Sequence, residues 1–182
     1  KKFNLEEKFK SAVENHQKNN LDVAINLYNE ILEIDPNNSS IYYHLGLAHN
    51  KKKQLNKSIH CYEKVIEIDP NYISAHFNLG IIYRELGDLE KEIICYEKTI
   101  SIDPNHAKAN NNLGLAFKKL GEYNKAKKYY ENAIKIDPNL VEAHNNLGTI
   151  FSELGESDKA IENYVIATKI NPDLEFTNNN LG

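Results

Sequence analysis

Residues 105–138 read NHAKANNNLGLAFKKLGEYNKAKKYYENAIKIDP, and this pattern returns with variations along the whole chain. The clearest sign of repetition is the set of prolines, which lie 34 residues apart at Pro36, Pro70, Pro104, Pro138 and Pro172. The glycines fall on two further series with the same step, Gly46 to Gly182 and Gly87 to Gly155. A fixed period of this size is typical of stacked repeat proteins, whose units bury apolar surface only against their neighbours. The sequence therefore predicts an array of repeats.

Within residues 105–138, apolar side chains recur with helical spacing in two blocks. The blocks are Ala109, Leu113, Ala116, Phe117 and Leu120, followed by Tyr123, Ala126, Tyr130, Ala133 and Ile134. Gly121 separates them, because the residue just past a helix end often takes a left-handed conformation that glycine adopts freely. Pro138 ends the second block, because proline disfavours helix in the residue before it. Each repeat is therefore expected to be an antiparallel hairpin of two amphipathic helices.

The composition argues against several classes of protein. The chain has 182 residues, of which 41% are hydrophobic and 26% are charged, and its formal net charge is −4. This balance argues against disorder, and no apolar run approaches the roughly 18 residues of a membrane span. No basic block is longer than residues 51–53, so nucleic acid and membrane are both poor partners for this chain. The compartment is not determined, although the cytoplasm is favoured.

Aligned on the prolines, the array divides into five full repeats and the start of a sixth. Their bounds are residues 3–36, 37–70, 71–104, 105–138, 139–172 and 173–182. The chain begins with Lys1, contains no Met and stops at Leu181 and Gly182 inside a repeat, which indicates a piece of a longer protein. The last repeat lacks a second helix to cover its neighbour, and this predicts either fraying of that end or head-to-tail or swapped self-association through it.

One set of residues matches a known family. Its pattern of Leu-Gly, aromatic, Ala, aromatic, Ala and Pro stands at Leu113, Gly114, Phe117, Ala126, Tyr130, Ala133 and Pro138, and again 34 residues later. On these residues the chain resembles the tetratricopeptide repeat family over its whole length, although Tyr42, His76, Asn110 and His144 replace the family's Trp. The resemblance implies an all-α fold, a right-handed superhelical α-solenoid of stacked antiparallel hairpins. It also implies a protein or peptide ligand held in a concave groove lined by the first helix of each hairpin.

A file of asparagines marks this groove. Asn78, Asn112, Asn146 and Asn180 each immediately precede a Leu-Gly pair. An Asn amide offers an acceptor and two donors, so each could bind one peptide unit of an extended ligand without reading its side chains. The arrangement resembles the asparagine ladder in the superhelix of O-GlcNAc transferase. The alternative is that these residues merely reflect an Asn-rich chain.

Helical spacing places further residues on the same face. The predicted groove residues beside the asparagine file are Tyr43, His44, Asn50, Phe77, Arg84 and Lys118. Tyr43 and Phe77 would bind apolar side chains, and later positions carry Asn instead. Arg84 and Lys118 could hold a carboxylate, with Arg84 the better bidentate donor.

Two residues break the pattern in the turns and the second helices. Lys53 stands where the later repeats have the turn Gly, so we expect strain or a different turn there. Glu92 replaces a small residue of the second helix, and we expect its carboxylate to bend out to solvent.

The sequence carries no sign of chemistry. It shows no Ser, His and Asp arrangement, no phosphate-binding loop and no metal-ligand spacing of its histidines, so we predict no catalytic residue, no metal and no cofactor. Cys61 and Cys95 are equivalent residues of adjacent repeats, too far apart to bridge, and are predicted to be free thiols.

Three functions remain open. The first is a scaffold, not itself an enzyme, that binds an extended peptide or protein segment in its groove. The second is the substrate-recruiting array of a larger transferase, because residues 12–36 resemble the start of arrays that precede bacterial glycosyltransferase or sulfotransferase domains. The third is a self-assembling structural solenoid.

Overall fold

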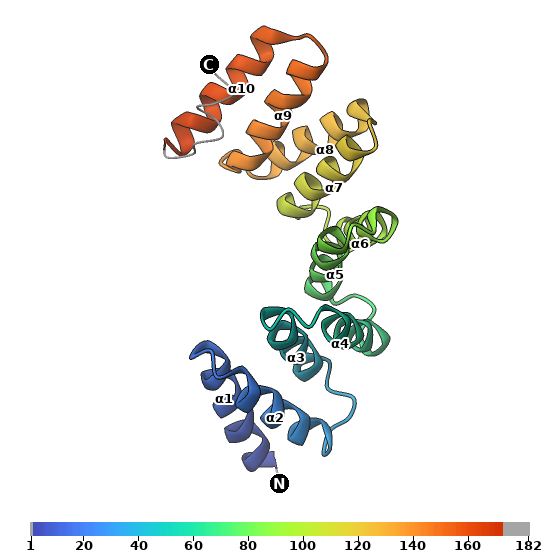
Figure 1. The fold of residues 1–182 in the computed structure, drawn as a ribbon, viewed down its shortest axis with the longest axis vertical. Helices are drawn as coiled ribbons and strands as arrows, with labels where there is room; N and C mark the ends of the chain where they lie inside the picture. Colours follow the sequence, from blue (N-terminus) through green and yellow to red (C-terminus); the bar gives the residue numbers. More distant parts are fainter. Residues whose placement is uncertain (1, 173–182) are drawn as a thin grey trace. The chain divides into compact units, whose positions relative to one another are not determined.

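The computed structural model describes residues 2–172, and these residues form ten α-helices and no strand (Figure 1). The helices are α1 (Lys2–Gln17), α2 (Leu21–Leu32), α3 (Ser39–Lys51), α4 (Leu55–Ile68), α5 (Ile73–Leu86), α6 (Leu89–Ile102), α7 (Ala107–Lys119), α8 (Tyr123–Ile136), α9 (Val141–Glu153) and α10 (Ser157–Ile170). The all-α prediction is confirmed. The predicted start of a sixth repeat, with Asn180 and the self-association surface, lies outside the described residues.

The helices belong to two compact units, which divide between Leu86 and Gly87. In the first unit, each of α1 to α4 packs against the helix that follows it. In the second unit, each of α6 to α9 packs against the next helix, and α7 also contacts α9. Odd-numbered helices are called first helices below, and even-numbered ones second helices.

The turn inside each hairpin ends at a residue with positive φ. Glycine takes this place at Gly87, Gly121 and Gly155, with φ between 73° and 76°, whereas Asn19 and Lys53 take it at 66° and 58°. The Gln54 N–H donates to the His49 carbonyl at 2.9 Å, and the Glu122 N–H donates to the Phe117 carbonyl at 3.0 Å. Both bonds close the same type of helix end. Lys53 therefore adopts the ordinary turn in a backbone conformation that costs a non-glycine residue about 1–2 kcal/mol.

The loops between repeats follow from the Asp-Pro pair. Asp69, Asp103 and Asp137 each accept the backbone N–H of the residue two positions later at 3.0 Å. This side-chain turn competes with helix continuation, and the proline that follows cannot donate to the preceding turn. The second helix therefore ends there, and a new hairpin begins.

The glycines inside the first helices make room for a tyrosine ring. A Cβ atom at Gly46 would lie 2.7 Å from Cε1 of Tyr62, and one at Gly114 would lie 2.8 Å from Cε1 of Tyr130. Real Cβ atoms do not approach this closely, so the glycine is required by the tyrosine of the paired second helix. Ser58 fixes the same hairpin by donating from Oγ to the Gly46 carbonyl at 2.8 Å.

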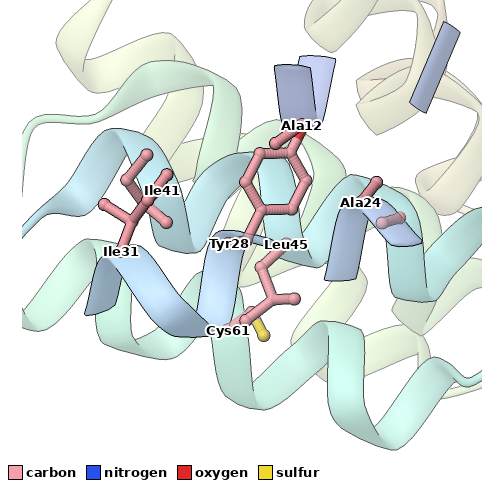
Figure 2. Packing of buried hydrophobic residues seen from close by; sticks show 8 residues of the cluster. Ala12, Ala24, Tyr28, Ile31, Ile41, Leu45 and Cys61 are labelled. Carbon is pink, nitrogen blue, oxygen red and sulfur yellow. The ribbon is translucent and has the colours of Figure 1, made fainter. Parts of the chain in front are cut away.

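The core of the first unit runs across hairpin boundaries. Figure 2 shows Ala12, Ala24, Tyr28, Ile31, Ile41, Leu45 and Cys61, which come from α1, α2, α3 and α4 and pack together. Burial of a large apolar side chain stabilises a fold by about 1.5–3 kcal/mol. Each hairpin therefore gains much of its stability from the hairpin beside it, as in stacked repeats.

The prediction for Glu92 is wrong. Its side chain is only 1% exposed, and its Oε2 lies 3.4 Å from Nζ of Lys119 on α7. Glu92 also stands in the first turn of α6, where the backbone N–H groups favour a negative charge. The buried carboxylate is thus stabilised by Lys119 and by the N-terminus of α6 instead of by solvent.

Among residues 2–172, no helix has the length and apolar character needed to cross a bilayer.

Candidate functional site

The predicted groove residues lie on one face of the first helices, here called the ladder face. Those among the described residues are all partly exposed: Tyr43, His44, Asn50, Phe77, Asn78, Arg84, Lys118, Asn112 and Asn146. Asn180 lies outside them. The first unit holds the members on α3 and α5, and the second unit holds those on α7 and α9. Helical spacing thus assigns these side chains to a face that retains contact with solvent.

Asn78 is tied to both helices of the preceding hairpin. Its Nδ2 donates to the hydroxyl of Tyr43 on α3 and to the hydroxyl of Tyr62 on α4, each at 3.3 Å. Tyr62 is fully buried, and burial raises the pKa of its hydroxyl well above its usual range. The hydroxyl stays neutral, and it holds the amide nitrogen of Asn78 toward the protein.

Asn112 repeats this contact in the second unit. Its Nδ2 donates to the hydroxyl of Tyr96 at 3.3 Å. Tyr96 precedes Asn112 by 16 residues, the same separation as between Tyr62 and Asn78. The contact between a second-helix tyrosine and the asparagine of the next first helix is therefore a property of the repeat.

Asn146 departs from this rule. Its Nδ2 donates instead to Oδ1 of Asn111, at 3.0 Å, which links α9 to α7. Tyr130 stands 16 residues before Asn146, yet its hydroxyl has no hydrogen-bond partner within residues 2–172. Tyr130 is fully buried, and burial raises the pKa of this hydroxyl also. Nothing in the residue pattern predicted this difference.

The first unit places an aromatic cluster on its ladder face. The ring of His44 packs edge-on against Phe9 at 5.2 Å and Tyr43 at 5.8 Å, and it stacks on Tyr28 at 5.9 Å, measured between centroids. Tyr43 in turn lies 5.1 Å from Tyr72. Sequence reasoning named Tyr43 and His44 but missed Tyr28 and Tyr72, because one belongs to a second helix and the other precedes α5.

His44 takes the place that Asn has in later repeats. Burial lowers its pKa from the usual range, and the nearby His16 lowers it further. The imidazole is therefore neutral near pH 7 and acts as an aromatic and hydrogen-bonding group.

Three polar residues share a further position of the first helices. Asn50, Arg84 and Lys118 follow one another at the step of 34 and are partly exposed. Asn50 and Arg84 belong to the first unit and Lys118 to the second. The binding of a carboxylate by Arg84 and Lys118 stays a prediction.

An apolar row on the ladder face escaped the sequence reasoning. Val13, Leu47, Ile81 and Leu115 are partly exposed and recur at the step of 34. Each lies four residues after an aromatic or Asn position of this face, and residues four apart are neighbours on a helix surface. The period that revealed the asparagines contained this signal as well.

Two hollows lie away from the ladder face. One, of about 650 Å³, is in the first unit, and its lining includes Tyr42, His49 and His60. The other, of about 630 Å³, is in the second unit, and its lining includes Asn110 and Lys128, which are equivalent to Tyr42 and His60. Tyr42 and His49 fall on the side of α3 opposite to the ladder face, given 3.6 residues per turn. None of the predicted groove residues lines either hollow.

Neither cysteine is placed to act as a reactive group. Cys61 and Cys95 are free and buried, as predicted. Burial raises the pKa of Cys61 to about 11 and that of Cys95 to about 12, so both thiols are protonated and poor nucleophiles at neutral pH. In the described part of the chain, no group of three or more His, Cys, Asp or Glu side chains could hold a metal ion.

Comparison with known proteins places these features in a family. A TPR repeat model matches residues 14–53, 48–87 and 80–121, and tetratricopeptide repeat models match residues 107–140 and 129–162. None of the curated protein sequences matches this chain.

Several solved structures have the same fold. A crystal structure of MamA is 25% identical, with a TM-score of 0.82 over 88% of this chain and 94% of that one. MamA 41-end from Desulfovibrio magneticus RS-1 is 17% identical, with a TM-score of 0.83 over 94% and 97%. YrrB, described as a TPR protein with an unusual peptide-binding site, is 20% identical, with a TM-score of 0.79 over 94% and 89%.

The family models span most of the described helices, and the likeness to these structures extends over both units. The predicted α-solenoid of helical hairpins is confirmed. The chain belongs to the tetratricopeptide repeat family.

Proposed function

We propose that the chain is an interaction scaffold that binds an extended peptide or protein segment along its ladder face. The observation that carries this proposal is the recurrence of partly exposed asparagines at one position of successive first helices, with Asn78 and Asn112 oriented by buried tyrosine hydroxyls. The nitrogen of each amide is engaged inside, so the amide has a defined orientation before any ligand arrives. Preorganised groups of this kind lower the entropic cost of binding.

Each unit, taken by itself, offers its own kind of contact to such a ligand. In the first unit, the aromatic cluster around Tyr43 and His44 suits apolar side chains. In the second unit, the amides of Asn112 and Asn146 suit a peptide backbone, and Lys118 suits a carboxylate. YrrB, whose description names a peptide-binding site, shares the fold and supports this kind of ligand.

The proposal assigns no catalytic residue, metal or cofactor to this chain. A recruiting role within a larger transferase would use the same surface and the same contacts, and it differs only in what is joined to the chain. Self-association as the sole function would leave the ladder face without a ligand, and the binding experiment separates it from the other two.

The test is selection from a random library of short, unstructured peptides on the purified protein, followed by calorimetric titration of the selected peptides. Replacing Asn112 and Asn146 together by Ala should weaken binding by about tenfold or more, since each lost hydrogen bond contributes about 0.5–1.5 kcal/mol. Circular dichroism checks that helicity is unchanged.

Lys128→Ala combined with Asn132→Ala is the matched control, because both residues line the hollow of the second unit. This variant should bind as the native chain does. A control that loses affinity while the asparagine variant keeps it would move the site to the hollow, and a library that yields no binding peptide would refute peptide binding altogether.

A further inference from the structure

The described ladder positions are not equivalent. Four second-helix tyrosines each precede a ladder residue by 16 positions: the pairs are Tyr28 and His44, Tyr62 and Asn78, Tyr96 and Asn112, and Tyr130 and Asn146. The first pair stacks ring on ring, and the next two are hydrogen-bonded. In the last pair the Tyr130 hydroxyl has no hydrogen-bond partner among the described residues, and Asn146 donates to Asn111.

This leaves a buried polar group unsatisfied. Tyr130 is fully buried and its hydroxyl has no partner in the described part of the chain. A hydroxyl removed from water without a new hydrogen bond is destabilising, and native proteins keep few such groups. The buried hydroxyl of Tyr130 is therefore unfavourable, whereas the equivalent hydroxyls of Tyr62 and Tyr96 are hydrogen-bonded.

The structure also contains the group that could relieve this contact. Asn146 has the same separation from Tyr130 that Asn112 has from Tyr96. A rotation of the Asn146 side chain would let its Nδ2 donate to the Tyr130 hydroxyl. The same rotation would release Oδ1 of Asn111, the acceptor that Asn146 now occupies.

We propose that a ligand peptide binds the second unit by exchange at Asn111: a main-chain N–H of the ligand donates to Asn111 Oδ1, and the displaced Asn146 donates to the buried hydroxyl of Tyr130. This inference rests on the proposed function. Among bonds within the protein and between protein and ligand, one is present before the exchange and two are present after it, while the ligand N–H gives up its bond to water. Asn111 then accepts a hydrogen bond from the ligand. Tyr130 is a positioning residue: it increases the affinity through its bond with Asn146 and does not touch the ligand.

The exchange also selects the conformation of the partner. A helical segment uses its backbone N–H groups internally, whereas an extended segment presents them outward. Asn111 is itself only 8% exposed, so the donor must approach closely along the ladder face. The partner chemistry that fits is an extended main chain with a free N–H at this position.

The rearrangement can be tested first without a ligand, by thermal unfolding. Tyr96→Phe is the matched control for Tyr130→Phe, since both rings are fully buried and only the Tyr96 hydroxyl accepts from a ladder asparagine. Tyr96→Phe should lower the melting temperature by about 2–4 °C, whereas Tyr130→Phe should leave it unchanged or raise it by up to about 2–4 °C, because it removes a hydroxyl that has no hydrogen-bond partner among the described residues. In an Asn111→Ala background, Asn146 is released, and Tyr130→Phe should now cost about 2–4 °C.

An equal loss for both Phe variants in the native background would overturn the inference, as would an Asn111→Ala background that leaves Tyr130→Phe without cost. A peptide selected from the random library provides the second measurement. Tyr130→Phe should weaken its binding about tenfold, equivalent to about 1.4 kcal/mol, and Lys128→Ala should not.

The outcomes of the two proposals are distinguishable. If no peptide is selected, the proposed function fails. If peptides bind but Tyr130→Phe leaves their affinity unchanged, the exchange is wrong while peptide binding stands. Methylation of single backbone nitrogens in the peptide should reveal one position at which affinity falls and the Tyr130→Phe effect disappears; an effect that persists at every position would contradict the role of Asn111.

Discussion

In the first unit the ladder face carries an aromatic cluster beside the amide of Asn78, whereas in the second unit the ladder asparagines Asn112 and Asn146 have no such cluster among the predicted groove residues that the structure describes. His44 and Asn146 occupy the same position of the repeat, yet one stacks on a tyrosine and the other is hydrogen-bonded to an asparagine. The helices and the contact between interior glycine and tyrosine are alike in both units. The side chains on the ladder face can therefore change from one repeat to another while the hairpin scaffold stays the same.

The largest effect is expected from removing an aromatic ring of the first unit. Tyr28→Ala deletes a fully buried ring that stacks on His44, and it should lower the free energy of unfolding by about 3–5 kcal/mol, as measured in urea. Tyr28→Phe keeps the ring and loses only a 3.5 Å contact with His16, so it should cost far less. Equal losses would mean that the hydroxyl, and not the aromatic cluster, stabilises this unit.

The second prediction concerns what the units share. Gly46→Ala and Gly114→Ala each drive a Cβ into a tyrosine ring, at 2.7 and 2.8 Å. Both should destabilise by about 1–3 kcal/mol from overpacking, partly offset by the higher helix propensity of Ala. Chemical denaturation of the two variants should give similar losses, and a large difference between them would break the view that the scaffold is common to both units.

The third prediction uses the turns, where the units differ. Lys53→Gly should stabilise the first unit by about 1 kcal/mol, because glycine adopts a φ of 58° without strain. Gly121→Ala, at the equivalent turn of the second unit with a φ of 73°, should destabilise by a similar amount. Melting temperatures that move in the same direction for both variants would show that backbone strain does not govern these turns.

The smallest effect is a pH dependence in the first unit. The pKa of His44 is lower in the folded protein than in the unfolded chain, so the unfolded chain binds more protons in mildly acidic solution. The stability associated with the neutral ring is complete above about pH 6.5 and declines as the pH falls below it. His44→Asn introduces the residue found at Asn78 and Asn146, and it should flatten the decline in unfolding free energy between neutral pH and about pH 5. An unchanged slope would mean that other groups, such as His16 or His49, account for it.

Much of the fold was predictable because it depends on local signals that repeat. Pro104, Pro138 and Gly121 interrupt helices for reasons of backbone geometry, and those reasons act within a few residues. The face on which Asn78 and Asn112 lie also follows from helical spacing alone. A period that returns five times leaves little freedom in such assignments.

The remaining features depend on partners far apart in the sequence. Glu92 is buried because Lys119 reaches it from the next helix, 27 residues away. Asn146 bonds Asn111 rather than Tyr130 through a choice of side-chain rotamer, and no residue pattern encodes that choice. Tyr72 joins the aromatic cluster from outside a helix, where periodicity gives no guidance.

The tyrosine contacts have a consequence for dissecting the chain. Tyr62 packs on the glycine of its own hairpin, but its hydroxyl reaches Asn78 in the following one. A fragment cut at a proline separates each ring from the amide that it orients. The smallest fragment that keeps a tyrosine together with the asparagine that it orients therefore starts at a second helix and ends after the next first helix. Such a fragment contains the proline that separates two repeats.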